Sequence, residues 1–287
     1  MTLRYTEKNH WTLEVHEDLL NLTESQAREV VRLITSNYVL VFKRQSLTAD
    51  QEVELAKKLG EPRPVYDLSK PLEESPHRYV AVNEYITRIT GKLNKDGKCT
   101  GAAGQPETFD WHLDLAFSKI RAPLYCLYGV EHTEGSCTSF LSFADAYKDL
   151  DVNLLERIKD KKVMVGHSQP LPTPYNTHVK PEKVSAPTVT EYDLIRTTPE
   201  GVTWLHFPPY QTKSMVDTSD EEFEELYSVL KEHVLQEKFM YHHYWEDGDF
   251  VVADQRTSMH KRWAFDKMQE RVVHRMTIWP MDVTSPE

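Results

Sequence analysis

The sequence predicts a mainly β protein with flanking helices (α+β), built as an antiparallel double sheet or jelly roll. Most apolar segments are short and rich in β-branched and aromatic residues, which favours strands. Glycine, proline and Asp-Gly turns separate these segments, as in TTPEGVT and WEDGDF. Only three segments have helical periodicity, and they do not alternate regularly with the strands. A doubly wound α/β fold is therefore disfavoured.

The helical segments carry start signals as well as an apolar stripe. Thr23 is followed three residues later by Gln26, and Thr48 by Gln51, which is the pattern of a capping box. Apolar residues recur at helical spacing after each start, so one face of each helix is expected to be buried. The predicted helices are 24–37, 49–60 and 220–235.

The other apolar segments predict strands. They are 38–45, 79–85, 124–131, 161–167, 190–197, 202–207, 238–245, 249–254 and 271–279. No internal repeat and no Pro/Ser-rich linker divides the chain, which indicates a single domain over 1–287. The glycine-rich segment 91–107 precedes a candidate site and is expected to form a flexible hairpin or lid.

Composition limits the class of partner. The net charge is −11 and no long run of lysine or arginine occurs, which argues against nucleic acid or an anionic membrane as the main partner. Three widely spaced cysteines without C-x-x-C disfavour a disulfide framework or a thiolate zinc site. No signal peptide or membrane-spanning run is apparent. We expect a cytoplasmic protein with a small-molecule substrate, and its assembly into a homo-oligomer is left open.

The stretch FDWHLDLAF contains a candidate metal site. In a strand, His112 and Asp114 would point to the same side. The spacing alone is weak evidence, because His16-x-Asp18 has it too. The best third ligand is His260, expected in a short loop after the strand that ends at Asp254. Two histidines and one carboxylate leave three positions open, which suits non-haem Fe(II) that must bind a cosubstrate and dioxygen together.

Two arginines in QERVVHRMTIWP point to an anion. Arg271 and Arg275 would share one face of the predicted strand, and the strand supplies no acid to pair with them. Buried guanidinium groups need partners. A bound carboxylate, held bidentately at Arg271, would be such a partner.

These residues together carry a family resemblance. The order W-H-x-D, then GSCTSF, then D-Q-R-x-x-x-H, then arginines eleven and fifteen residues after the last histidine resembles the taurine dioxygenase-like (TauD/TfdA) family. These are Fe(II)- and 2-oxoglutarate-dependent dioxygenases. The N-terminal VLVFKRQSLTADQEVELAKKLGEP also resembles the family's opening strand and helix, so the resemblance covers about residues 38–279.

The resemblance implies a double-stranded β-helix (jelly-roll) core and roles for six residues. His112, Asp114 and His260 would ligate Fe(II). Thr138 and Arg271 would hold the distal carboxylate of 2-oxoglutarate. Arg275 would lie near the keto-acid end or contact an anionic group of the substrate. O2 would be the other cosubstrate.

The sequence also departs from the family, which affects the substrate. After the Gly-Glu of the first helix it has Arg63 nearby but lacks the histidine of taurine-oxidising members, and LHFPPY replaces an asparagine-bearing strand end. Taurine is therefore disfavoured as the substrate. Residues that could line a substrate pocket, or simply pack, are Arg63, Trp111, His206, Phe207 and Tyr210.

The expected reaction is oxidation, foremost hydroxylation, of an unactivated C–H bond in a small anionic or amino-acid-like molecule, with release of succinate and CO2. Desaturation or cyclisation of a natural-product intermediate needs only different positioning. Two other classes stay open, a zinc hydrolase on the same ligands and a non-catalytic jelly-roll binding protein. Zinc hydrolysis would give no role to Arg271 with Thr138.

Overall fold

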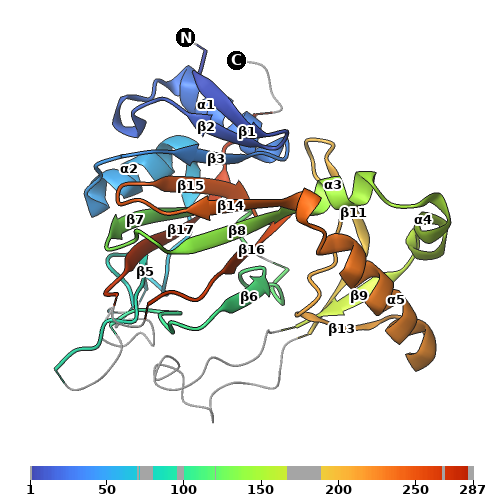
Figure 1. Cartoon of the computed structure of the whole chain (residues 1–287). Helices are drawn as coiled ribbons and strands as arrows, with labels where there is room; N and C mark the ends of the chain where they lie inside the picture. Colours follow the sequence, from blue (N-terminus) through green and yellow to red (C-terminus); the bar gives the residue numbers. More distant parts are fainter. Residues whose placement is uncertain are drawn as a thin grey trace.

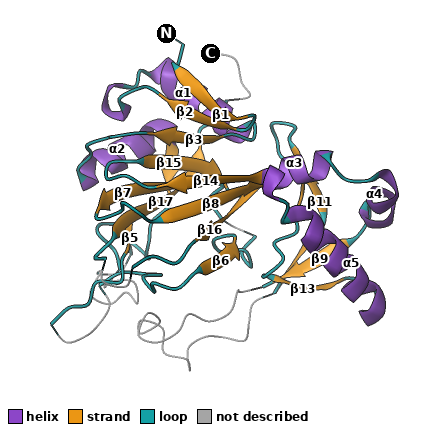
Figure 2. Cartoon of the chain, in the orientation of Figure 1, coloured by secondary structure: helices purple, strands orange, loops and turns teal. Residues whose placement is uncertain are grey.

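The chain folds around two facing β-sheets with helices outside them (Figures 1 and 2). The computed structural model describes residues 2–69, 71, 80–95, 100–119, 121–166, 189–266 and 269–283. Strands predominate, as expected for the jelly-roll core that the sequence predicts.

The larger sheet has eight strands in the order β1-β2-β3-β15-β7-β17-β4, with β5 beside β17. All its pairs are antiparallel except β2 with β3. Its strands are β1 (Tyr5–Asn9), β2 (Thr12–Val15), β3 (Val39–Phe42), β4 (Gly60–Pro62), β5 (Thr87–Ile89), β7 (Leu124–Glu131), β15 (Phe250–Asp254) and β17 (Val272–Pro280).

The second sheet has four antiparallel strands in the order β14-β8-β16-β6. They are β6 (Phe109–His112), β8 (Cys137–Ser142), β14 (Met240–Tyr244) and β16 (Ser258–Arg262). In this sheet β6 pairs with β16 on one side only, so it is an edge strand. The chain leaves β6 directly into a turn.

The central strands of the larger sheet are buried on both faces, which explains their almost unbroken apolar sequences. On β3, Val39 and Val41 pack into the core between the two sheets, whereas Leu40 and Phe42 pack under the helices. β7 and β15 alternate in the same way. Side-chain alternation therefore builds two core layers from one sheet.

Two helices, α1 (Glu24–Thr35) and α2 (Ala49–Leu59), cover the outer face of the larger sheet. Both capping boxes predicted from the sequence are present, with Thr23 bonded to Gln26 and Thr48 to Gln51. Gly60 ends α2, as predicted, and a Cβ there would lie 2.0 Å from the carbonyl oxygen of Trp279.

A second group of elements lies beside the four-stranded sheet. It contains a three-stranded sheet in the order β10-β9-β13, a two-stranded sheet of β11 and β12, and three helices that share one apolar cluster. The elements are α3 (Phe143–Lys148), α4 (Val152–Ile158), β9 (Lys162–Val165), β10 (Thr190–Asp193), β11 (Ile195–Thr197), β12 (Thr203–Leu205), β13 (Thr212–Met215) and α5 (Asp220–Val234).

Some local predictions were wrong. The described part of 79–85 is a bend with one isolated bridge at Ala81, and the strand there is β5, which begins at Thr87. The predicted strand 190–197 is broken at Leu194 into β10 and β11. His260 lies within strand β16 and not in a loop. Helices α3 and α4 were not predicted, because each spans less than about two turns and leaves little periodicity to detect.

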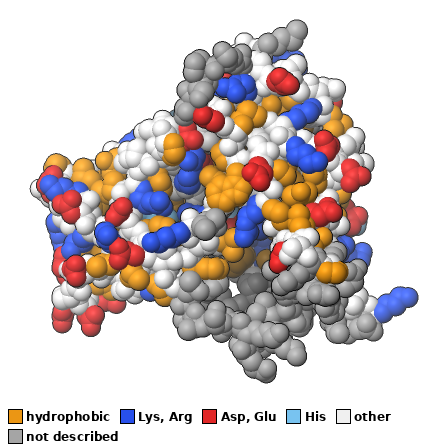
Figure 3. Space-filling model, turned by 180° about the vertical axis from the view of Figure 1, so that it is seen from behind, with side chains coloured by type: hydrophobic (Ala, Val, Ile, Leu, Met, Phe, Trp, Pro, Cys, Tyr) orange, Lys and Arg blue, Asp and Glu red, His pale blue; other side chains and the backbone are white. Residues whose placement is uncertain are grey.

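The far face of the molecule shows basic and acidic side chains interspersed around apolar ones (Figure 3). Within the described ranges, no helix combines the length and apolar character that crossing a membrane requires.

Candidate active site

Two strands of the four-stranded sheet bring His112, Asp114 and His260 together. His112 ends β6 and is the register partner of His260 on β16, with ring centroids 4.2 Å apart. Asp114 follows in the turn after β6, and its Oδ1 lies 3.8 Å from His112 Nε2. One ligand atom from each residue lies within 4.8 Å of the others. This is close to the span of one coordination sphere.

Both imidazoles are held neutral with a nitrogen lone pair available. Burial is the main cause that lowers the pKa of His112, and it also lowers the pKa of His260 to about 3. His112 Nδ1 donates to the carbonyl oxygen of Asp110 at 2.6 Å, which leaves Nε2 unprotonated and facing Asp114. His260 stacks on the ring of Tyr125, and its buried Nδ1 has no hydrogen-bond partner among the described residues. Two neutral imidazoles beside a carboxylate are a donor set that fits Fe(II).

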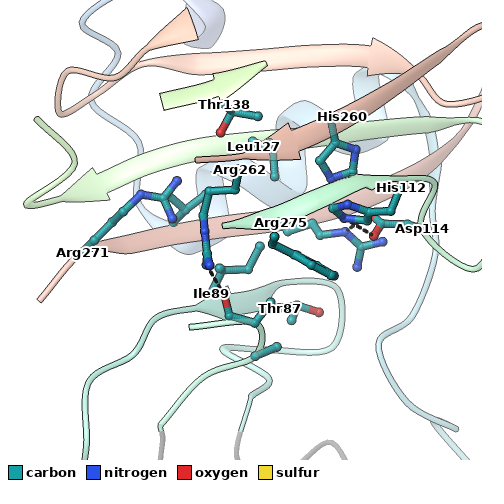
Figure 4. A pocket seen from close by; sticks show the side chains of 14 residues that line it. Thr87, Ile89, His112, Asp114, Leu127, Thr138, His260, Arg262, Arg271 and Arg275 are labelled. Carbon is teal, nitrogen blue, oxygen red and sulfur yellow. Dashed lines mark hydrogen bonds and ion pairs between the residues drawn. The ribbon is translucent and has the colours of Figure 1, made fainter. Parts of the chain in front are cut away.

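Asp114 is ionised and oriented by an arginine. Burial opposes its ionisation, but the charge of Arg275 and the hydrogen bond from its side chain hold the pKa of Asp114 well below its usual range. Arg275 Nε donates to Asp114 Oδ2 at 2.6 Å. Since Oδ2 is engaged by Arg275, Oδ1 is the oxygen turned toward His112 (Figure 4).

Arg271 is a buried cation at the other end of the pocket (Figure 4). Its side chain is 4% exposed, and its Nε donates to Ser136 Oγ at 3.0 Å. Burial and the charge of Arg262 lower its pKa to about 9, so it is still protonated at pH 7. Among the described residues, no carboxylate lies within ion-pair distance of it. The guanidinium lies 5.9 Å from the Trp245 ring centroid.

Thr138, on β8, lines the same cavity as Arg271. Its Oγ1 accepts a hydrogen bond of 2.9 Å from Trp245 Nε1. An indole N–H can only donate, so the hydroxyl hydrogen of Thr138 is left to donate to something else. Arg271 and Thr138 therefore offer donors without an acceptor from the described protein.

Arg262 was not singled out from the sequence, although it also lines the cavity. Two residues after His260 on β16, it reaches across to the segment before β6. Its guanidinium donates to the carbonyl oxygens of Ala103 and Gln105, and to that of Glu107 at 2.7 Å. Only a structure can find such contacts, because backbone carbonyls leave no sequence signature.

The cavity enclosed by these residues has a volume of about 250 Å³. Three arginines and one carboxylate line it, together with the two neutral imidazoles. The remaining lining is mostly apolar. The lining residues are Thr87, Ile89, Ala102, Ala103, Phe109, His112, Asp114, Leu127, Thr138, His260, Arg262, Arg271, Val273 and Arg275.

None of the five residues considered for substrate binding is among the residues that line the cavity. Trp111 packs in the apolar cluster beside the four-stranded sheet, on the opposite side of β6 from His112. His206 and Phe207 are fully buried, and Tyr210 is on the surface. The described cavity therefore gives these four residues no place in its lining. The fifth, Arg63, lies close enough to Arg275 that their charges repel, and burial and this repulsion lower the pKa of Arg63.

Comparison with known proteins supplies the family. Residues 10–277 match the taurine catabolism dioxygenase TauD, TfdA family. The chain is 26% identical over 278 residues to an alpha-ketoglutarate-dependent 2,4-dichlorophenoxyacetate dioxygenase of Cupriavidus pinatubonensis, with 89% of each chain covered. It is 27% identical over 205 residues to pentalenolactone F synthase of Streptomyces arenae, covering 66% of this chain and 67% of that protein.

Solved structures share the fold. A taurine dioxygenase from Burkholderia xenovorans superposes with a TM-score of 0.74 at 23% identity, covering 96% of this chain and 89% of the other. AAD-2, solved in complex with Mn(II) and N-oxalylglycine, has a TM-score of 0.74 at 24% identity over the full length of both chains.

Proposed function

Because the chain belongs to the taurine catabolism dioxygenase TauD, TfdA family, we propose that His112, Asp114 and His260 hold its Fe(II). Members of this family are 2-oxoglutarate-dependent dioxygenases, and the chain is accordingly an oxidoreductase that uses Fe(II), 2-oxoglutarate and O2. Family membership therefore argues against the two other classes that the sequence left open, a zinc hydrolase and a non-catalytic binding protein. The observation that carries the ligand assignment is the convergence of two neutral imidazoles and one carboxylate in one buried cavity.

The protein's contribution at the metal is to fix the protonation and the direction of each ligand. The Asp110 carbonyl sets the tautomer of His112, and Arg275 turns Asp114 Oδ1 inward. When bound, Fe(II) would allow O2 to oxidise 2-oxoglutarate to succinate and CO2 and so provide the oxidant for the substrate. Hydrogen bonds thus orient two of the three proposed ligands before metal binds.

Arg271 and Thr138 are proposed to hold the distal carboxylate of 2-oxoglutarate. Arg271 keeps free donors after its Nε donates to Ser136, and the Thr138 hydroxyl keeps its hydrogen because its oxygen accepts from Trp245. A carboxylate at this point would receive charge-assisted hydrogen bonds from two buried side chains. It would also relieve the cost of burying the Arg271 charge without a counter-ion.

The substrate is proposed to be a small anionic or amino-acid-like molecule. The cavity lining has three arginines against one aspartate. Fe(II) and the 2-oxoglutarate dianion cancel each other's charge, so the positive surplus remains when both are bound. Arg275, with Arg63 beside it, is proposed to meet the anionic group of the substrate. Hydroxylation of an unactivated C–H bond is the proposed outcome.

The segment 91–107 is proposed as a lid on this cavity, within a single domain that spans 1–287. Ala102 and Ala103 line the cavity, and Arg262 donates hydrogen bonds to backbone carbonyl oxygens of the same segment. Residues 96–99 of the segment lie outside the described residues.

One experiment tests the proposed function. Fe(II) and then 2-oxoglutarate are added to the anaerobic protein, and the weak visible charge-transfer band of the chelate is recorded. Oxygen and a panel of small carboxylates, sulfonates and amino acids follow, with succinate as the readout. We expect the band in the wild type, its absence in His112→Ala, and substrate-dependent succinate with at least one anionic compound. A wild type with neither band nor succinate would contradict the assignment.

A further inference from the structure

A glutamine outside the cavity holds the residue between two proposed metal ligands. Leu113 stands between His112 and Asp114, and its backbone N–H donates to Gln211 Oε1 at 2.7 Å. Gln211 Nε2 donates in return to the carbonyl oxygen of Leu113 at 3.0 Å. We infer that Gln211 is a positioning residue that sets the geometry of the His112-Leu113-Asp114 segment for metal binding.

Leu113 needs such a partner because of its place in the sheet. His112 is paired with His260 across the β6–β16 ladder, and successive residues of a strand direct their backbone groups to opposite sides. The N–H and C=O of Leu113 therefore point away from β16, toward the open side of the edge strand. Both would be buried there without a partner, since Leu113 is 1% exposed. The side-chain amide of Gln211 takes the place of a neighbouring strand.

Gln211 is itself held from several directions. Its backbone N–H donates to the carbonyl oxygen of Pro208, and its own carbonyl oxygen accepts from Gly166, at the end of β9. Tyr227 on α5 donates to the carbonyl oxygen of Pro209, in the same loop. Gln211 is 4% exposed. The two prolines of LHFPPY and these contacts thus deliver a pre-oriented amide to Leu113.

Leu113 connects two proposed ligands that are held by different parts of the fold. His112 is fixed by the β6–β16 ladder, whereas Asp114 already lies in a turn, followed by Leu115 at a φ of 52°. Leu113 is the only residue between them, so its backbone orientation decides where the Asp114 carboxylate lies relative to the His112 ring. This inference rests on the proposed ligand assignment, and Gln211 touches neither the cavity nor the three ligands' side chains.

The test compares metal affinity with fold stability. Gln211→Leu removes both hydrogen bonds at nearly constant volume. Gln255→Leu is the matched control, because Gln255 is a buried glutamine that donates one amide bond to the Ala122 carbonyl away from Leu113. Mn(II) dissociation constants are measured on the purified full chain without 2-oxoglutarate, together with the d–d absorption of the Co(II) form and the unfolding temperature of the metal-free protein.

We expect both variants to be less stable than the wild type without metal. Only Gln211→Leu should weaken Mn(II) binding, by about 10–100-fold, as is typical when a group supporting a metal ligand is lost. Only that variant should alter the Co(II) spectrum. Equal Mn(II) affinities for the two variants would overturn the inference and leave Gln211 a structural residue.

A second variant keeps the inference testable if Gln211→Leu does not fold. Gln211→Asn retains the amide but is one methylene shorter, so it should also weaken Mn(II) binding relative to Gln255→Leu. If affinity were unchanged in this variant, the inference would again fail. A wild type that binds no Mn(II) would instead refute the ligand assignment of the proposed function, which keeps the two failures apart.

Discussion

Replacing Arg271 by leucine should have two opposite effects: the affinity for 2-oxoglutarate should fall, and the stability of the metal-free protein should rise. The opposite signs follow from the burial of a guanidinium whose one polar contact among the described residues is Ser136. A residue that served only the fold would lower stability when removed. A buried arginine that serves to bind an anion lowers the stability of the folded protein as long as no anion is bound.

The magnitudes come from the environment of the guanidinium. The lowering of its pKa to about 9 corresponds to on the order of 4–5 kcal/mol against the charged form in the folded protein. Loss of the Ser136 hydrogen bond and of the contact with Trp245 offsets part of this, so we expect the metal-free variant to gain about 1–3 kcal/mol. Because the pKa stays above neutrality, the unfavourable contribution is present throughout pH 6–8 and declines only as pH rises through about 9.

The loss in cosubstrate binding should be larger. Removing one partner of a buried, charge-assisted contact costs about 2–4 kcal/mol, which is roughly 30–1000-fold in the dissociation constant of 2-oxoglutarate. The affinity of Arg271→Lys for 2-oxoglutarate should lie between those of the wild type and Arg271→Leu, since lysine keeps the charge but lacks the planar guanidinium. The affinity for Mn(II) alone should not change, because Arg271 and the proposed metal ligands occupy opposite ends of the cavity.

The assay is isothermal titration of Mn(II)-loaded protein with 2-oxoglutarate, beside denaturant unfolding of the metal-free protein. The reasoning would be refuted by a less stable metal-free Arg271→Leu whose 2-oxoglutarate binding changes by less than about fivefold, or about 1 kcal/mol. Equal losses in Mn(II) and 2-oxoglutarate affinity would also count against it, since they would mean that the arginine shapes the whole cavity.

Three other substitutions test the remaining structure. Asp114→Ala should reduce succinate formation at least about 100-fold and weaken Mn(II) binding by a factor of at least about ten; turnover at the wild-type rate would remove Asp114 from the ligand set. Arg262→Met should release the carbonyls around Ala103 and speed tryptic cleavage after Lys95 several-fold, whereas an unchanged cleavage rate would mean that the lid is held by other contacts. Glu52→Gln should become more stable relative to the wild type as pH rises from 4 to 7. Burial raises the pKa of Glu52 despite its bond to His274, so the wild type loses folding stability as this carboxyl ionises. Urea unfolding at several pH values measures the difference in unfolding free energy, and a difference that does not change with pH would contradict this.

The parts of the fold that could be predicted from the sequence are those whose signal is local. Capping boxes need only a threonine and a glutamine three residues apart, and a strand buried on both faces shows as one apolar run. The alternation of Arg271, Val273 and Arg275 on one face of β17 also follows from the strand period. These three residues do line the cavity, while Met276 and Ile278 pack under the helices.

The sequence indicated which side chains would lie together in the cavity, but not how the chain brings two of them there. His112 and Asp114 were expected on one side of a strand, but β6 ends at His112 and the turn brings Asp114 inward. The proximity of the pair was anticipated, although its cause was not. Gln211 and Arg262 could not be anticipated, because both act on backbone atoms of distant segments, and side-chain-to-backbone contacts depend on tertiary placement that no residue pattern encodes.

The direct pairing of β6 with β16 has a consequence for biosynthesis. His112 can meet its partner His260 only after most of the chain has been synthesised, because strands of both sheets lie between them in the sequence. Such long-range pairing forms late, since loop closure must precede it. A chain emerging from the ribosome therefore carries no assembled triad until β16 has left the exit tunnel. The proposed ligands can therefore bind Fe(II) only once synthesis of the chain is nearly complete.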